Sequence, residues 1–163
     1  MSIPATEKKL LAAIDAYETD ARRDEVQRAL TERLRSLYGF GEKGVYYDLT
    51  DVYFYGRSCE LAARGHNSDG LPHPQVQVGL GVTSAEGFPI FVHTYAGNVH
   101  DSKTVPDILL AFREQGLTDV TFVWDRGITS GVNTDELTSL GARVLCGVPL
   151  SEKLKQLLNN LGF

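Results

Sequence analysis

The first forty residues carry apolar side chains at the three- and four-residue spacing of amphipathic helices. The segments "PATEKKLLAAIDAYE" and "EVQRALTERLRSLYG" hold these positions at Leu10, Leu11, Ile14, Tyr17, Val26, Leu30, Leu34 and Leu37. Pro4 suits a first helical turn, and Gly39 suits a C-terminal cap. Residues 1–40 are therefore predicted to form a helical hairpin, which either packs on the following sheet or faces a partner or DNA.

From residue 44 the pattern changes to that of β-strands. The segment "VYYDLT" (45–50) is rich in β-branched and aromatic residues, "QVQVGLGVT" (75–83) alternates, and "PIFVHTY" (89–95) follows a short turn. The alternation of the second strand puts Val76, Val78, Leu80 and Val82 on one face and Gln75, Gln77, Gly79 and Gly81 on the other. Residues 56–74 hold turn-forming residues without a period, so we expect a loop followed by an antiparallel meander.

The second half alternates helical and strand patterns. Residues 102–117 predict a helix with Ser102 or Thr104 near its start and Gly116 at its end. The short apolar segments 119–125 and 142–148 predict strands that are buried on both faces. Residues 133–141 and 151–161 predict two more helices, the first opened by Asn133 or Thr134. The order predicts an α/β fold with a mixed sheet.

Composition narrows the class of protein. The chain has 163 residues, of which 42% are hydrophobic, so one folded core with a small extra element is expected. No apolar run is long enough to span a membrane, and the start lacks a signal-peptide pattern, so we expect a soluble cytoplasmic protein without a membrane partner. Its two cysteines lie far apart and outside any zinc-binding pattern. The net charge of −5 gives no global basic footprint for nucleic acid.

Two aspartates stand out because of their places in apolar strands. Asp48 lies inside the first predicted strand, and Asp125 follows "TFVW" directly. A carboxylate in a buried strand is costly unless it is paired, hydrogen-bonded or bound to a cation. If the first and fourth strands are parallel neighbours, about 4.8 Å apart, the two side chains converge at the carboxyl ends of the strands. The two charges would repel unless a cation lay between them, and carboxylate oxygens suit Mg²⁺ or Mn²⁺.

Each aspartate also has a purely structural explanation. Asp125 stands before "RGITSG" and so suits a turn or a helix cap. Thr50 or a backbone amide would satisfy the charge of Asp48. Both explanations stay open from the residues alone.

Three segments together resemble a known family. The segments "YYDLTDVYF", "LPHPQVQVGLGVTSAEGFPIFVHTYAGNVHDSKTV" and "VTFVWDRGITS" stand in this order. Over roughly residues 44–155 the chain resembles the catalytic core of bacterial insertion-sequence transposases of the Asp-Asp-Glu (DDE) type. The resemblance implies a ribonuclease H-like fold of the retroviral integrase superfamily. It also implies metal-dependent DNA cleavage and strand transfer, with transposon-end DNA as the partner and possible homo-oligomers.

The resemblance also implies roles for individual residues. Asp48 and Asp125 match the first two catalytic acids and would bind two Mg²⁺ or Mn²⁺ ions. Asn98 and His100, with Asp101, would lie at the active edge of the sheet, or else cap the following helix. Arg126 would meet a phosphate or form a surface ion pair.

The third acid of the family has no clear match. In the family it is a glutamate on a helix well after the fifth strand, whereas this chain ends at Phe163. Glu152 is a weak candidate, because it also suits a helix start, and Asp135 and Glu136 are weaker still. We therefore expect residues 41–163 to form a DDE core that is incomplete at its C-terminus.

Three functions follow as expectations. The first is the catalytic-core fragment of a transposase. The second is a non-catalytic remnant that serves in self-association or regulation, and the third is a stand-alone ribonuclease H-like nuclease.

Overall fold

The computed structural model describes residues 6–16, 19–39, 44–67, 69–117, 120–129, 135, 137, 141–148 and 150–162. Its elements are α1 (Glu7–Asp15), α2 (Asp20–Tyr38), β1 (Gly44–Tyr53), β2 (Gln75–Thr83), β3 (Pro89–Ala96), the 3₁₀ turn η1 (Asp101–Lys103), α3 (Val105–Glu114), β4 (Thr121–Trp124), the 3₁₀ turn η2 (Arg126–Ile128), β5 (Arg143–Cys146) and α5 (Glu152–Leu161).

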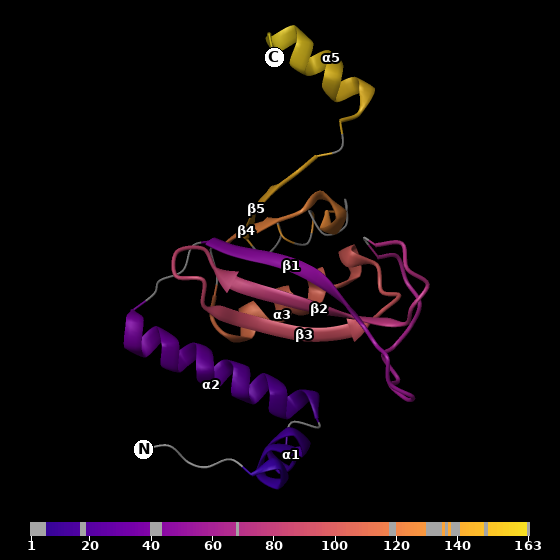
Figure 1. The fold of residues 1–163 in the computed structure, drawn as a ribbon. Helices are drawn as coiled ribbons and strands as arrows, with labels where there is room; N and C mark the ends of the chain where they lie inside the picture. The colour runs from indigo at the N-terminus through magenta and orange to yellow at the C-terminus, as the bar shows by residue number, and fades with distance from the viewer. Residues whose placement is uncertain are drawn as a thin grey trace.

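One five-stranded sheet organises the chain, with the strand order β3-β2-β1-β4-β5. The pairs β1–β2 and β2–β3 are antiparallel, whereas β1–β4 and β4–β5 are parallel. Strand β3 therefore runs parallel to β1, and the carboxyl ends of β1, β3, β4 and β5 meet at one edge, the carboxyl edge (Figure 1). The predicted α/β fold with a mixed sheet is confirmed.

Helix α3 packs on one face of the sheet, which we call the covered face. Figure 1 shows this helix behind the strands. The apolar side of α3 carries Val105, Ile108, Leu109 and Phe112, all buried. Its partners in the core are apolar and aromatic side chains of the three strands β1, β3 and β4: Val45, Tyr47, Phe91, Phe122 and Trp124.

The covered face of β2 is formed by its glutamines and glycines rather than by its valines. Gly79 and Gly81 are buried there because large rings from neighbouring strands and α3 occupy the space above them. A Cβ on Gly79 would lie 2.8 Å from the Tyr47 hydroxyl, and one on Gly81 would lie 3.1 Å from the Phe91 Cβ. Glycine at these two positions therefore leaves space for the aromatic side chains of the core.

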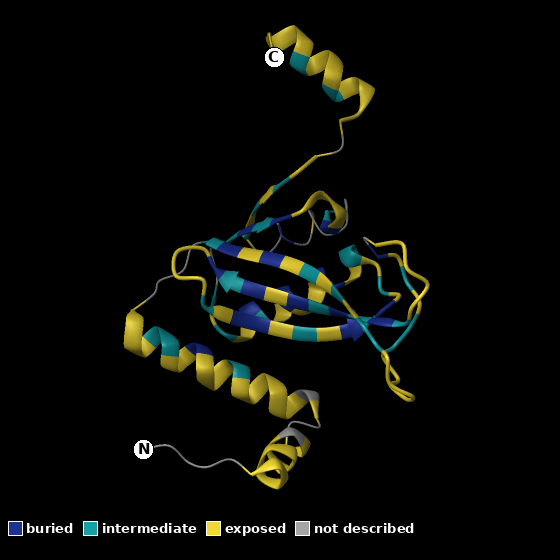
Figure 2. Cartoon of the chain, in the orientation of Figure 1, coloured by how far each residue is buried: buried dark blue, intermediate teal, exposed yellow. Residues whose placement is uncertain are grey.

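The opposite face, which we call the open face, carries alternate residues of β1, β2 and β3. No helix in the described part of the chain packs across it, and the strands in Figure 2 alternate between buried and exposed residues. Tyr46, Val52, Leu80 and Val92 are 42–49% exposed on this face. The face of β2 that carries its valines and Leu80 is thus more exposed than the face that carries its glutamines and glycines.

Helix α2 lies along the β3 edge and does not cover a face. The Gln27 side chain donates from Nε2 to the Val92 carbonyl oxygen at 2.9 Å and accepts at Oε1 from the Val92 backbone N–H. Leu34 packs against the core, but Val26, Leu30 and Leu37 are 41–56% exposed. The expectation that this apolar stripe packs on the sheet is therefore right for Leu34 and wrong for the other three.

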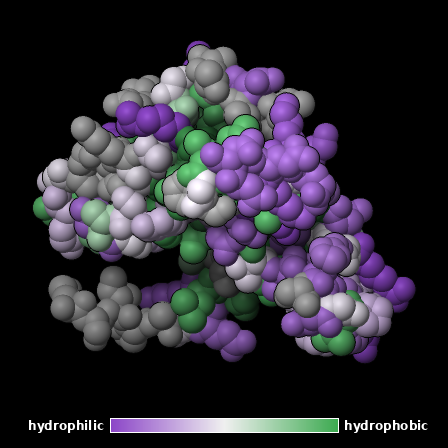
Figure 3. All heavy atoms as spheres, turned by 90° about the horizontal axis from the view of Figure 1, so that it is seen from above, coloured by the Kyte–Doolittle hydropathy of each residue, from purple (hydrophilic) through white to green (hydrophobic). Residues whose placement is uncertain are grey.

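The C-terminal elements are more exposed than the sequence predicts. Strand β5 is an edge strand in which Arg143 and Leu145 are exposed, so the prediction of a strand buried on both faces is wrong. Helix α5 projects away from the sheet and has no buried residue (Figures 1 and 2). Viewed from this end, hydrophobic side chains gather in a band near the middle of the molecule, between hydrophilic surfaces (Figure 3).

The structure describes the first predicted helix of the second half in full and the second in part. The helix expected from residue 102 begins later, with Thr104 as its N-cap, because the turn η1 precedes it. Of the helix expected over residues 133–141, the described residues are Asp135 and Leu137, both helical, and Gly141. Its predicted start at Asn133 or Thr134 lies outside the described residues. Among the helices that the structure describes, none is long and apolar enough to cross a membrane.

The substitution Gly79→Ala is expected to destabilise the fold by about 1–3 kcal/mol, because the new methyl group overlaps the Tyr47 hydroxyl in a packed core. Denaturant unfolding measures the change. The matched control is Gly147→Ala, which adds the same methyl group at an exposed position 3.4 Å from the nearest atom. Equal stability of the two variants would contradict this account of the glycine.

Candidate active site

Asp48 and Asp125 lie at aligned positions on neighbouring parallel strands. The β1–β4 register pairs Gly44 with Thr121, Val45 with Phe122 and Tyr46 with Val123. The pairing ends there, and Asp48 and Asp125 each lie two residues beyond the last pair. Asp125 follows β4 with extended backbone angles, φ −74° and ψ 160°, so the alternation of the strand continues through it. The expected parallel pairing of the first and fourth strands is therefore confirmed, and the two aspartates follow this pairing at equivalent positions.

The two aspartates also share a face of the sheet. Tyr47 and Trp124 point into the core on the covered face, with their ring centroids 6.5 Å apart. The next residue on each strand consequently faces the open side, and both Asp48 and Asp125 are exposed. Asp48 is thus not buried, and the desolvation cost inferred from its place in an apolar strand does not apply.

Among the described residues, neither carboxylate makes the hydrogen bond that its structural explanation requires. Asp125 occupies the N-cap position of η2, but its side chain makes no cap hydrogen bond. Among the described residues, none donates a hydrogen bond to the Asp48 carboxylate. Both carboxylates are therefore available to a cation. No group of three or more histidine, cysteine or acidic side chains suited to a metal occurs within the described ranges.

The other predicted site residues lie at several places. His100 is the N-cap of η1, where its ring accepts from the Ser102 backbone N–H at 3.4 Å, so it caps the next turn. Asn98 is exposed in the preceding turn, and Arg126 is exposed at the start of η2. Glu152 pairs with Lys155 on the projecting helix α5 and does not join the two aspartates. Asp135 is exposed, and Glu136 lies outside the described residues.

A buried network at the carboxyl edge escaped the sequence analysis. The Tyr47 hydroxyl donates to Thr104 Oγ1 at 2.8 Å, and Thr104 Oγ1 donates to the Asp101 carbonyl oxygen at 2.7 Å. Tyr95 donates to the Thr104 carbonyl oxygen at 3.4 Å. Burial raises the pKa of both tyrosine hydroxyls above the usual phenol value, so both stay protonated and able to donate.

A second missed group centres on the glutamines of β2. Gln75 is fully buried, and its Nε2 lies 3.1 Å from Asp51 Oδ1, 3.0 Å from the His66 carbonyl oxygen and 3.1 Å from the Gly97 carbonyl oxygen. Its neighbour on the same face, Gln77, donates to Asp101 Oδ1 at 3.5 Å. In the sequence, this group is indicated by the pair of glutamines at alternate positions, a pattern that is also typical of a strand facing solvent.

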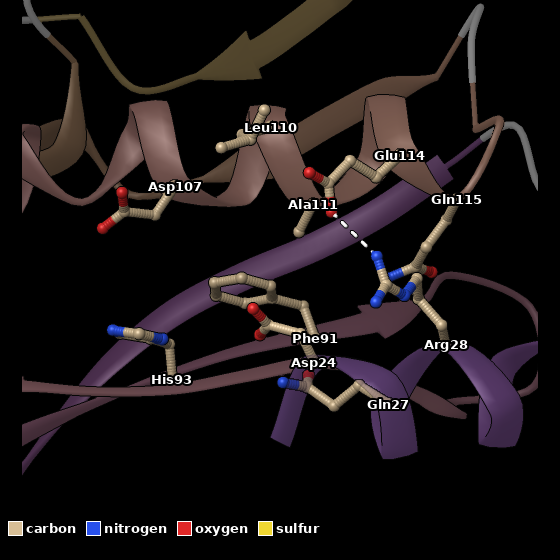
Figure 4. Close-up of a pocket in the computed structure, with 10 residues that line it drawn as sticks. All are labelled: Asp24, Gln27, Arg28, Phe91, His93, Asp107, Leu110, Ala111, Glu114 and Gln115. Carbon is tan, nitrogen blue, oxygen red and sulfur yellow. Dashed lines mark hydrogen bonds and ion pairs between the residues drawn. The ribbon is translucent and has the colours of Figure 1, made fainter. Parts of the chain in front are cut away.

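A pocket of about 150 Å³ lies elsewhere, between α2, β3 and α3. Figure 4 shows Phe91 and His93 among its lining residues, with Arg28 paired to Glu114 at 3.3 Å. Neither Asp48 nor Asp125 lines this pocket, so it is separate from the carboxylate pair.

Comparison with solved structures identifies similar folds. The piggyBac transposase in a synaptic complex with hairpin DNA is 15% identical with a TM-score of 0.52, and the match covers 72% of this chain and 25% of that chain. A chain of the simian T-cell lymphotropic virus intasome in complex with PP2A regulatory subunit B56 gamma is 12% identical with a TM-score of 0.45, over 74% of this chain and 37% of that one. The catalytic domain of Mos1 mariner transposase is 13% identical with a TM-score of 0.44, over 86% and 68%.

The match spans 25% of the length of the piggyBac transposase and 37% of the length of the intasome chain. Comparison with curated proteins finds no match. At the level of sequence families, residues 39–161 match the family described as the transposase DDE domain, whose chemistry depends on a divalent metal ion. Since this match covers most of the chain and agrees with the fold, the protein belongs to the transposase DDE domain family.

Proposed function

We propose that this chain forms the catalytic core of an insertion-sequence transposase that cuts and joins DNA, with Asp48 and Asp125 as metal ligands. The observation that carries the proposal is the alignment of these two exposed carboxylates on adjacent parallel strands. Neighbouring strands lie about 4.8 Å apart, which suits two carboxylates that share a cation with metal–oxygen distances near 2.1 Å.

The donor set fits Mg²⁺ or Mn²⁺, because both ions prefer oxygen ligands. When bound, such ions activate a water or a DNA 3′-hydroxyl and stabilise the leaving oxygen of an in-line displacement at phosphorus. The role of Asp48 and Asp125 is to hold the ions at fixed positions on a rigid sheet. Arg126 follows Asp125 directly and is exposed, so its guanidinium is suited to a DNA phosphate at the same edge. Asn98 lies in the turn after β3 and is suited to a similar contact.

DNA is the proposed partner of the complete protein. The acidic net charge of −5 means that this chain supplies little electrostatic attraction to phosphates by itself. We assign residues 41–163 to the DDE core and residues 1–40 to a separate helical element. The start of the family match at residue 39 supports this division.

Replacing Asp48 by asparagine is expected to stabilise the metal-free protein by roughly 0.2–1 kcal/mol, because it removes repulsion between two adjacent like charges. Thermal unfolding in EDTA and in Mn²⁺ measures the effect. Mn²⁺ should raise the unfolding midpoint of the wild-type chain and leave that of Asp48→Asn unchanged. The control is Glu86→Gln, which removes an exposed carboxylate in the β2–β3 turn. Equal stabilisation of wild type and Asp48→Asn by Mn²⁺ would show that Asp48 is not a ligand.

The 163-residue chain is expected to show at most trace nicking of supercoiled plasmid in Mn²⁺ and no strand transfer. The reason is that two acids hold two ions less well than three, and a misplacement of about 1 Å can lower a rate by two orders of magnitude. Agarose gels of plasmid incubated with the chain, with Asp48→Ala and with Asp125→Ala measure the nicking. Robust cleavage that either substitution abolishes would instead favour the stand-alone nuclease.

A further inference from the structure

The turn η1 is tied to the strand that carries Asp48. Thr104, at the end of this turn, is fully buried and forms a relay in which it accepts from the Tyr47 hydroxyl and donates to the Asp101 carbonyl oxygen, at 2.8 and 2.7 Å. Tyr47 immediately precedes Asp48 on β1. A shift of η1 relative to β1 would therefore break the buried hydrogen bond between Tyr47 and Thr104.

The same turn also contacts the segment that follows Asp125. Residues of η1 and η2 pack against each other. The Asp101 carboxylate lies close to Gly127, since a Cβ on that glycine would be 3.3 Å from Asp101 Oδ2. Gly127 is two residues beyond Asp125. Asp101 is thus the residue of η1 whose side chain reaches the β4 side of the carboxyl edge.

A buried glutamine lies within hydrogen-bonding reach of this carboxylate. Gln77 is 5% exposed, and its Nε2 donates to Asp101 Oδ1 at 3.5 Å, at the long end of the hydrogen-bonding range. Its Oε1 is buried without a hydrogen-bond partner among the described residues. Gln77 therefore offers the Asp101 carboxylate one donor, while β2 holds the glutamine in place.

We propose that Asp101 is a positioning residue that sets the separation between Asp48 and Asp125. The inference rests on the proposed function, because it assumes that the two aspartates share a metal site. The backbone carbonyl of Asp101 is linked to β1 through Thr104 and Tyr47, and its carboxylate lies beside Gly127 of η2, two residues beyond Asp125. Groups that orient metal ligands in this way typically contribute 10–100-fold to metal affinity.

Two substitutions at Asp101 separate positioning from charge. Asp101→Ala removes the side chain that contacts Gln77 and η2, and is expected to weaken Mn²⁺ binding 10–100-fold. Asp101→Asn removes the charge but keeps the size, and the amide can pair with Gln77 in either orientation. Its Mn²⁺ affinity should stay close to that of the wild type. Calorimetric titration of the full chain, with the Mn²⁺ resonance signal as a second readout, measures both affinities.

The outcomes distinguish the possible roles of Asp101. Unchanged Mn²⁺ affinity in a folded Asp101→Ala chain would overturn the proposal, and so would an Asp101→Asn chain that binds as weakly as Asp101→Ala, since that result assigns the effect to charge. If Asp101→Ala does not fold, Gly127→Ala provides the test, because its methyl group displaces the carboxylate from η2. Unchanged binding by Gly127→Ala would then overturn the proposal.

Two further variants complete the experiment. Asp48→Ala tests the metal site itself: if it binds Mn²⁺ as the wild type does, the proposed function fails, whatever the result at Asp101. Glu86→Ala removes an exposed acid from the β2–β3 turn, at the other end of the sheet. It should leave both Mn²⁺ affinity and folding unchanged.

Discussion

The hydrogen bond between the Tyr47 hydroxyl and Thr104 Oγ1 is the contact on which the arrangement of the carboxyl edge depends. It forms inside the core, where an unpaired hydroxyl would cost about 1–3 kcal/mol, so each group requires the other. It is possible only because Gly79 leaves room for the Tyr47 ring on the covered face of β2. One glycine, one tyrosine and one threonine thus connect the packing of the sheet to the turn that follows β3.

The sheet, and not proximity in sequence, brings the two aspartates together. Asp48 and Asp125 belong to segments separated by two strands and a helix, and the parallel pairing of β1 with β4 aligns them. Because the covered face is filled by aromatic rings, the alternation of both strands leaves the aspartates on the open face, with access to solvent. The same packing that stabilises the core therefore leaves both carboxylates exposed to solvent.

The order of strands and helices was predictable, because periodicity carries that information, and the parallel pairing of β1 with β4 agrees with the arrangement expected for the strands next to Asp48 and Asp125. The faces of β2 were not predictable. Two glutamines and two glycines at alternate positions are typical of a strand face exposed to solvent. In the structure the glutamines are buried and rings from β1, β3 and α3 pack on the glycines, and the sequence of β2 alone does not reveal these contacts. The role of Thr104 was also hidden, because its partner Tyr47 is distant in the sequence. Strand β5 is exposed because it lies at the edge of the sheet, and the apolar content of its sequence does not specify that position.

The two hydrogen bonds between Gln27 and the backbone of Val92 have a consequence for how copies of the protein meet. An unpaired strand edge is a template on which another chain can add a strand and so begin to polymerise. At Val92 the outward N–H and C=O are already occupied, and the bulk of α2 stands in front of them. The edge strand of a second molecule could pair with β3 only after displacing α2, so the helix blocks growth of the sheet at this edge. At the opposite edge, a second molecule would meet β5, which is only four residues long.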